Sequence, residues 1–163
     1  MTPPAGAPPA TLTRDLTDIA ATQALGATIS GLLRAGDVVA LYGELGAGKT
    51  TLARALIAAL GHTGEVPSPT FTLVQSYDLS PVAVWHFDLY RIDAPDEIIE
   101  LGIEEALADA ISLIEWPERM ASQLPPDRLD ILLSYTDSEV GRRAALTGHG
   151  NWGSRLAEAS NVL

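Results

Sequence analysis

The chain contains no cysteine, which excludes disulfide bonds, thiol catalysis and zinc sites built on cysteine. It also lacks an apolar run of the roughly 18–20 residues that a helix needs to cross a bilayer. Residues 1–13 have neither the charged segment nor the apolar segment of a secretory signal. We therefore expect a cytoplasmic protein without a membrane partner.

Basic residues are scarce, because 10 lysines and arginines stand against 21 acidic residues, a formal net charge of −11. Proteins bind bare nucleic acid largely by neutralising its phosphates, so this chain is a poor candidate for binding RNA by itself. Lysine is scarcer still, since Lys49 is the only one and the other nine basic residues are arginines. A single retained ammonium indicates a role that a planar guanidinium does not fill.

The segment around Lys49 has the pattern of a phosphate-binding loop. Val38–Tyr42 is a short apolar run typical of a buried strand, and apolar residues recur at helical spacing from Thr50 to Leu60. Between these two segments, GELGAGKT matches G-x-x-x-x-G-K-[ST], the P-loop or Walker A motif. Strand, glycine loop and helix together provide the context that this motif requires.

The residue types of the loop suit the phosphate chain of a nucleotide. Glycines let the backbone turn tightly, so that N–H groups and the positive end of the helix dipole can face an anion. Lys49 can reach the β- and γ-phosphates, and the Thr50 hydroxyl can ligate Mg²⁺. We predict that ATP or ADP binds with Mg²⁺ at Gly43, Glu44, Leu45, Gly46, Ala47, Gly48, Lys49, Thr50 and Thr51.

The rest of the pattern predicts an α/β fold, a single P-loop NTPase domain over residues 11–163 after a disordered Pro/Ala-rich lead-in at 1–10. Three layers are expected, with a mostly parallel central sheet into which antiparallel hairpins at 71–89 and 128–147 are inserted. Strands are predicted at 10–16, 38–42, 71–77, 82–89, 110–115, 128–135 and 142–147. Helices are predicted from Thr17 or Asp18 to about Leu33, and at 50–60, 95–103, 104–109 and 152–159.

Two carboxylates follow apolar strands, Asp88 after VAVWHF and Glu115 after AISLI. Ligands of open α/β sheets lie at the carboxyl ends of the strands, so both side chains are expected beside the phosphates. Either one could hold Mg²⁺, directly or through water. His86 points to the same face as Asp88, and we interpret it as a packed strand histidine rather than a base. From the residues alone, Ser68-Pro69-Thr70 is better interpreted as a turn than as a phosphate sensor.

Four segments in order, GELGAGKTTLARAL, SPTFTLVQSY, HFDLYRI and IEWPER, resemble the bacterial TsaE family. Members of that family are small ATPases of tRNA threonylcarbamoyladenosine biosynthesis. The resemblance covers roughly residues 16–148. It implies slow ATP hydrolysis in partnership with TsaB and TsaD, the pair that modifies adenosine 37 of tRNA. The chain would then reach tRNA only through this complex.

The same resemblance assigns roles to individual residues. Lys49 takes the phosphate role and Thr50 the Mg²⁺ role, while Asp88 is the Walker B-like acid. Glu115 is the second carboxylate on the metal side. Thr70 belongs to a switch-like loop, which moves our interpretation of this segment from a plain turn to a functional one. The resemblance thus implies a catalytic set of Lys49, Asp88, Glu115 and Thr70 and a metal-binding set of Thr50, Glu115 and Asp88. It also implies that Arg142 and the segment Asp18–Thr22 lie beside the nucleotide base.

Two alternatives stay open. A small-molecule or nucleoside kinase usually carries a lid of clustered arginines, which this sequence does not have. A nucleotide-gated binding module without significant turnover needs the same phosphate cradle as a slow ATPase, so the sequence separates these two poorly.

Overall fold

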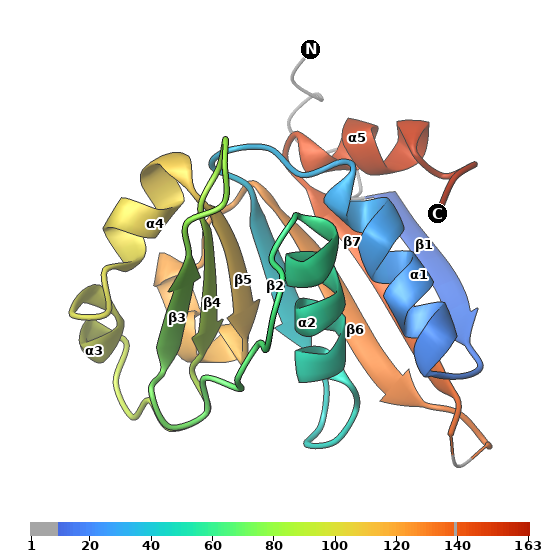
Figure 1. The fold of residues 1–163 in the computed structure, drawn as a ribbon, viewed down its shortest axis with the longest axis horizontal. Coiled ribbons are helices and arrows are strands. Elements are labelled where there is room, and N and C mark those ends of the chain that lie inside the picture. Colours follow the sequence, from blue (N-terminus) through green and yellow to red (C-terminus); the bar gives the residue numbers. More distant parts are fainter. Residues whose placement is uncertain (1–9, 139) are drawn as a thin grey trace.

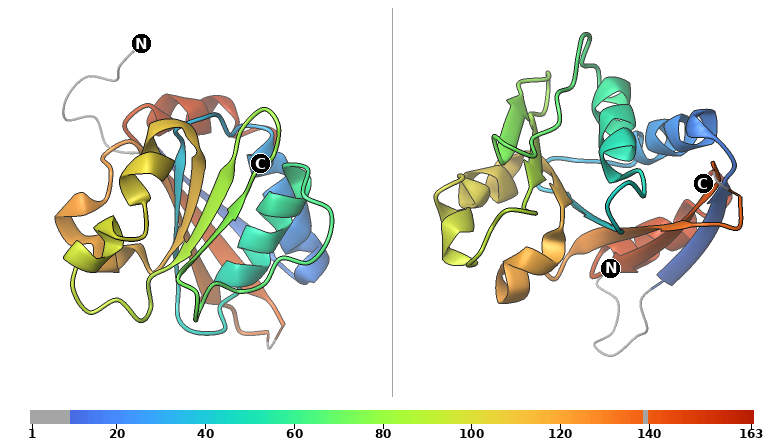
Figure 2. Two further views of the ribbon diagram at one scale, coloured as in Figure 1. Left: turned by 60° about the vertical axis from the view of Figure 1, so that its left-hand side comes forward. Right: turned by 90° about the horizontal axis from the view of Figure 1, so that it is seen from below.

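The computed structural model describes residues 10–138 and 140–163, which form one seven-stranded sheet with helices on both faces (Figures 1 and 2). The predicted lead-in at 1–10 lies outside these residues, apart from Ala10, which begins β1. The strands are β1 (Ala10–Leu16), β2 (Val38–Tyr42), β3 (Val74–Tyr77), β4 (Val84–Asp88), β5 (Ile111–Glu115), β6 (Arg128–Tyr135) and β7 (Arg142–His149). The helices are α1 (Ile19–Ser30), α2 (Lys49–Ala59), α3 (Asp96–Ile99), α4 (Ile103–Asp109), α5 (Trp152–Glu158) and the 3₁₀ segment η1 (Pro117–Gln123).

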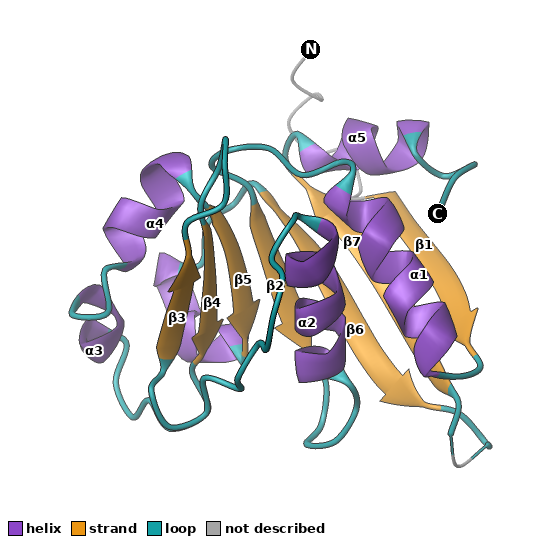
Figure 3. Ribbon diagram, in the orientation of Figure 1, coloured by secondary structure: helices purple, strands orange, loops and turns teal. Residues whose placement is uncertain are grey.

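The sheet has the strand order β1-β7-β6-β2-β5-β4-β3 (Figure 3). Its four central strands, β6, β2, β5 and β4, are parallel to one another. Antiparallel pairs flank them, β3 with β4 on one side and β6 with β7 and β1 on the other. The predicted parallel centre with antiparallel hairpins is therefore confirmed. The carboxyl ends of β2, β4 and β5 open at the same edge of the sheet, which is where the phosphate loop begins.

Two apolar cores lie on opposite faces of the sheet. Val39 and Leu41 of β2 belong to a buried cluster with Leu52 and Leu56 of α2, and α1 joins the same cluster. Val38 belongs to a second cluster with buried residues of β4, β5, α3, α4 and η1. Successive residues of a strand face opposite sides, so a strand buried on both faces is apolar at every position. This explains the continuous run VVAL and confirms the three layers.

The strand predicted from Phe71 begins only at Val74. Leu73 has a φ of +71°, and its N–H donates to the Pro69 carbonyl oxygen at 2.7 Å. Residues 69–73 therefore form a turn, and the chain becomes extended only after it. The conformation of Leu73 is the reason the strand is shorter than its sequence pattern, since a non-glycine residue rarely takes a positive φ.

Two helix boundaries also differ from the prediction. The helix predicted over 95–103 is interrupted, because Gly102 has a φ of +86° and turns the chain. Helix α3 ends at Ile99, and α4 begins directly after Gly102. Helix α1 ends at Ser30 rather than near Leu33, and the chain continues in a tighter turn in which Leu32 donates to Ile29. No helix in the described part of the chain is long and apolar enough to cross a membrane.

Helices α1 and α2 approach closely at Gly26. A Cβ placed on Gly26 would lie 2.7 Å from the Cβ of Ala55 and 3.2 Å from its carbonyl carbon. Gly26 is itself buried in the middle of α1. The missing side chain lets α1 press against the helix that carries Lys49 and Thr50, which fixes α2 over the sheet.

We predict that Gly26→Ala destabilises the fold by about 1–3 kcal/mol, the range for overpacking a core. Alanine has the higher helix propensity, so a loss of stability would show that the contact with Ala55 outweighs propensity. Gly31→Ala is the matched control, since Gly31 has an α-helical φ of −65° and its added Cβ would meet nothing closer than 3.5 Å. Urea unfolding followed by circular dichroism measures both, and equal effects at the two positions would contradict the prediction.

Candidate active site

The phosphate loop leaves the end of β2 and enters α2 at Lys49. Gly43, Gly46 and Gly48 have φ values of +146°, +81° and +108°, a left-handed region that favours glycine. A Cβ on Gly43 would lie 2.6 Å from the carbonyl oxygen of Leu133 in β6. Strand, glycine loop and helix are thus arranged as the motif predicts. The loop surrounds the amino end of α2, where unpaired N–H groups and the helix dipole favour an anion.

Lys49 is folded back onto this loop. Its Nζ donates to the carbonyl oxygens of Gly43 at 2.6 Å and Glu44 at 2.9 Å. The ring of Trp116 lies over the ammonium, 4.4 Å from Nζ to the ring centroid. Burial lowers the pKa of Lys49, and the nearby charges of Glu115 and Asp88 oppose this shift. The ammonium is therefore held at the base of the loop by contacts that phosphate oxygens could replace.

The aromatic cover over Lys49 depends on an uncommon backbone conformation. Trp116 directly follows the last residue of β5, and its φ of +60° and ψ of +50° place it in the left-handed region. Its ring also contacts the ring of Tyr90, with 5.0 Å between centroids. Pro117 then begins η1, so the chain turns sharply where the strand ends.

Glu115 points at the first turn of α2. The Thr50 hydroxyl donates to its Oε1 at 2.9 Å and to its Oε2 at 3.2 Å. The Nε2 of His86 lies 2.7 Å from Oε2. Only 2% of Glu115 is exposed, so these partners account for a carboxylate that burial would otherwise destabilise.

Asp88 lies opposite Glu115 in the parallel β4–β5 ladder, where the two residues are Cα partners. Its Oδ2 accepts from the Thr70 hydroxyl at 3.1 Å, and its Oδ1 accepts from the Tyr90 N–H at 3.1 Å. Burial raises the pKa of Asp88 above its ordinary value, and the neighbouring Glu115 adds to the rise. The Tyr90 and Thr70 hydrogen bonds act in the opposite direction.

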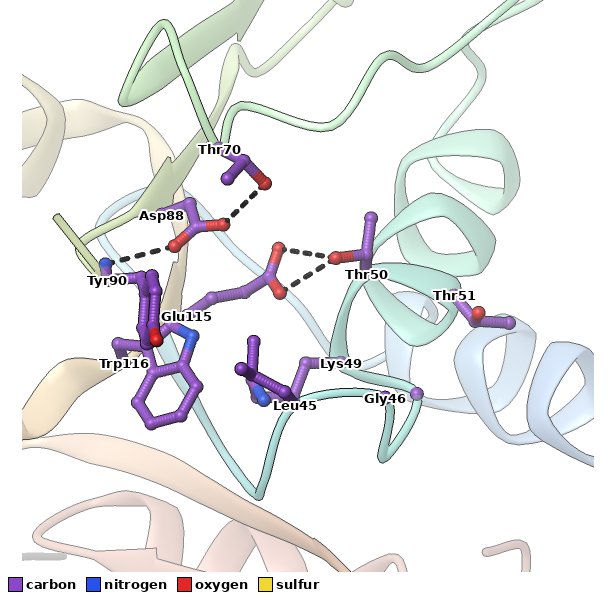
Figure 4. Close-up of a pocket in the computed structure, with 11 residues that line it drawn as sticks. Leu45, Gly46, Lys49, Thr50, Thr51, Thr70, Asp88, Tyr90, Glu115 and Trp116 are labelled. Atoms are coloured by element: carbon purple, nitrogen blue, oxygen red, sulfur yellow. Dashed lines mark hydrogen bonds between the residues drawn. The ribbon is translucent and has the colours of Figure 1, made fainter.

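These groups line a cavity of about 210 Å³ at the mouth of the loop (Figure 4). In the close-up, Thr50 and Glu115 face each other, Thr70 lies above Asp88, and Trp116 flanks Lys49. All four residues of the predicted catalytic set therefore border one cavity, as do all three of the predicted metal-binding set. The lining residues are Leu45, Gly46, Gly48, Lys49, Thr50, Thr51, Thr70, Asp88, Tyr90, Glu115 and Trp116.

Arg142 lies on the other side of the phosphate loop. Its guanidinium donates to the Gly46 carbonyl oxygen at 3.4 Å and stacks 4.4 Å above the ring of Tyr135. A second cavity of about 160 Å³ lies here, and Gly46, Gly48 and Thr51 line both cavities. Asp18 and Thr22 also line the second one, so the two segments expected beside the nucleotide base meet at one place.

Two contacts of the site have no counterpart in the sequence analysis. The Tyr135 hydroxyl donates to the Leu45 carbonyl oxygen at 2.8 Å, which ties the phosphate loop to the end of β6. The contact between His86 and Glu115 was also missed, although His86 was correctly placed on a buried strand. The position of His86 two residues before Asp88 was the available signal, because residues of that spacing share a strand face.

The donor set suits a hard cation. Thr50, Glu115 and Asp88 present oxygen atoms, the ligands that Mg²⁺ prefers, and the glycine cradle beside them leaves room for phosphate oxygens. Among the described residues no group of three His, Cys, Asp or Glu side chains could hold a metal ion by themselves. That is consistent with Mg²⁺, which usually binds one or two carboxylates together with waters and substrate phosphates.

We predict that Asp88→Asn stabilises the free protein at pH 8. The pKa of Asp88 is higher in the folded protein than in the unfolded chain, so the folded state binds this proton more tightly. The resulting gain in folding stability is complete below the unfolded pKa and is lost as pH rises through the folded pKa. Asparagine keeps the shape without the charge, so its advantage should shrink as pH falls toward 4. Urea unfolding in EDTA across this range tests the sign. Asp96→Asn, at an exposed carboxylate, is the control, and a wild type more stable than Asp88→Asn at pH 8 would contradict the prediction.

A sequence model of the threonylcarbamoyl adenosine biosynthesis protein TsaE matches residues 16–144. The curated tRNA threonylcarbamoyladenosine biosynthesis protein TsaE of Haemophilus influenzae is 41% identical over 123 residues, which cover 75% of this chain and 77% of that protein. The Bacillus subtilis protein of the same name is 35% identical over 138 residues, covering 84% and 85%. The crystal structure of Bacillus subtilis YdiB superposes with a TM-score of 0.80 at 28% identity, covering 94% of this chain and 95% of that one.

The matched region includes the phosphate loop, Thr70 and both carboxylates of the cavity. The resemblance noted in the sequence is thereby confirmed, and the chain belongs to the TsaE family of threonylcarbamoyl adenosine biosynthesis proteins.

Proposed function

We propose that this protein binds ATP with Mg²⁺ and hydrolyses it slowly, as a component of the machinery that modifies adenosine 37 of tRNA. In this proposal it acts on the TsaB–TsaD pair, which activates its hydrolysis, and it does not transfer the threonylcarbamoyl group itself. The setting would be the cytoplasm, where tRNA is modified. Family membership supports the pathway, and the geometry of the cavity supports the chemistry.

One observation carries the ATPase proposal: a hydroxyl at the first turn of α2 and a carboxylate at the end of β5 meet beside the phosphate loop. Thr50 Oγ1 and Glu115 Oε1 are 2.9 Å apart, and Asp88 is the Cα partner of Glu115. Phosphoryl-transfer sites of the P-loop class place a Ser or Thr hydroxyl and an acidic side chain around Mg²⁺ in this way.

In this proposal, different residues of the chain bind the phosphates, hold the metal and orient the attacking water. Backbone N–H groups of the loop and the Lys49 ammonium would hold the phosphate chain, with Lys49 leaving the carbonyl oxygens that it now contacts. Thr50, Glu115 and Asp88 would hold the metal, the carboxylates directly or through water, and bound Mg²⁺ would neutralise charge that develops on the phosphate oxygens. Asp88 and Thr70 would orient the attacking water, because the Thr70 hydroxyl already contacts the Asp88 carboxylate.

Exposed apolar side chains near the cavity support the proposal that a partner docks over the site. Leu45 and Tyr90 line the cavity and are 63% and 39% exposed, and Phe71, which follows the lining residue Thr70 in the chain, is 80% exposed. Arg91 lies over the Phe71 ring, with 4.5 Å from Cζ to the ring centroid. Exposed large apolar side chains at a functional cleft are typical of protein interaction sites. A partner that covered these side chains would exclude water from the phosphates, and exclusion of water strengthens electrostatic interactions in a site.

The test is ATP hydrolysis by the purified chain, alone and with a matching TsaB–TsaD pair. We expect a slow basal rate that rises with the pair. Glu115→Gln should lower the stimulated rate by about 100-fold, because the metal-side charge is lost while the shape is kept. Nucleotide binding in EDTA should persist in this variant. Glu104→Gln, at an exposed carboxylate of α4, is the matched control and should leave the rate unchanged.

Three outcomes would contradict the ATPase proposal or its setting. If Glu115→Gln supported tRNA modification in full, hydrolysis would not be required, and a nucleotide-gated binding module would be the better description. If the rate ignored the pair but responded to a small acceptor, the protein would be a kinase. If the wild-type chain bound no nucleotide, the phosphate site itself would be wrong.

A further inference from the structure

His86 is a buried polar side chain that the proposed mechanism does not use. It lies in the middle of β4, between the antiparallel neighbour Gln75 and the parallel neighbour Leu113, and it has no exposed surface. It does not line the phosphate cavity. A nucleotide in that cavity would therefore not contact the imidazole, and any effect of His86 on the site must pass through another residue.

That residue is Glu115. His86 Nε2 lies 2.7 Å from Glu115 Oε2, a short contact between two almost fully buried side chains. A carboxylate that binds a metal is ionised and only accepts hydrogen bonds, so in the proposed site Nε2 is the donor. The other ring nitrogen, Nδ1, is buried and has no hydrogen-bond partner within the described residues. Among the described residues, Glu115 is therefore the one hydrogen-bond partner of the His86 ring.

The second partner of Glu115 has another task. The Thr50 hydroxyl, which donates to both Glu115 oxygens in this structure, is also the P-loop ligand for Mg²⁺. If Thr50 turned its oxygen lone pairs to a metal, the hydrogen bond between His86 and Oε2 could remain, because His86 does not line the cavity. His86 is thus the contact that can hold the orientation of Glu115 both without and with the metal.

We propose that His86 is a positioning residue, whose Nε2–H fixes Oε2 of Glu115 so that the carboxylate is presented to Mg²⁺ at the phosphate loop. This inference rests on the proposed magnesium–nucleotide site. Residues that orient a metal ligand through a hydrogen bond typically change metal affinity or activity by 10–100-fold when they are replaced. His86 would act in this way without touching nucleotide or metal.

The experiment measures how Mg²⁺ changes the affinity for a fluorescent ADP analogue, which needs no turnover. His86→Leu removes the donor and keeps an apolar side chain in an apolar setting. We expect the Mg²⁺ concentration for half-maximal effect to rise by about 10–100-fold, while ADP affinity in EDTA changes by less than about 2-fold. His86→Gln places an amide N–H near the position of Nε2, so it should restore most of the magnesium response.

Two controls separate positioning from general damage to β4. Val84→Ala makes a cavity in the same strand, two residues before His86 on the same face, so it should lower the melting temperature and leave the magnesium titration unchanged. In a Glu115→Gln background, His86→Leu should add no further loss of magnesium response, because a residue that acts through Glu115 has nothing left to orient.

A wild-type magnesium response in His86→Leu would overturn the proposal. So would a magnesium response in His86→Gln no stronger than that in His86→Leu, or a loss in Val84→Ala as large as that in His86→Leu. If His86→Leu does not fold, His86→Asn replaces it, since the shorter amide cannot reach Glu115 and should show the same loss. Absence of any magnesium effect in the wild type would instead overturn the proposed function, so the two failures are distinguishable.

Discussion

The parallel pairing of β6, β2, β5 and β4 positions the phosphate loop and both carboxylates of the site. Leu41 is the partner of Glu115, and Tyr42 is the partner of Leu132, so these strands end at one edge of the sheet. The chain leaves this edge through Gly43, close enough to the backbone of β6 that no side chain fits there. The phosphate loop is therefore held by the backbone of β6 on one side, and on the other it faces Glu115, the last residue of β5, with Asp88 at the end of β4 beside it. Changes in strand register would move all of these groups together.

The electrostatics of the cavity follow from burying unlike charges side by side. Lys49, Asp88 and Glu115 are each at most 5% exposed, and an isolated buried charge would be costly. The structure offsets that cost with short contacts inside the protein: carbonyl oxygens for Lys49, a hydroxyl and a ring nitrogen for Glu115, and a hydroxyl and an N–H for Asp88. In the proposed phosphate site, phosphate oxygens would replace only the carbonyl oxygens that Lys49 now contacts.

The sequence was sufficient wherever a local pattern determined the structure. The phosphate loop is one continuous motif, and the strand ends at Asp88 and Glu115 are visible because apolar runs stop there. Their adjacency followed from the parallel sheet. The start of β3 was not predictable, because nothing in the amino-acid sequence indicates that Leu73 takes a positive φ. Contacts such as Tyr135 with Leu45, 90 residues apart, depend on strand order and on side-chain rotamers that no spacing encodes.

The single lysine has a practical consequence for chemical probing. In most proteins amine-reactive reagents label many surface lysines, whereas here the only side-chain amine lies under Trp116 at 4% exposure. The amine becomes accessible only when it leaves the carbonyl oxygens of the loop and the ring of Trp116, and a reagent can acylate it only then. The rate of acylation at this position therefore reports how often the ammonium leaves the loop carbonyls. Side-chain cross-linking to partners can instead use carboxylates, because the one lysine side chain contacts the loop that follows β2.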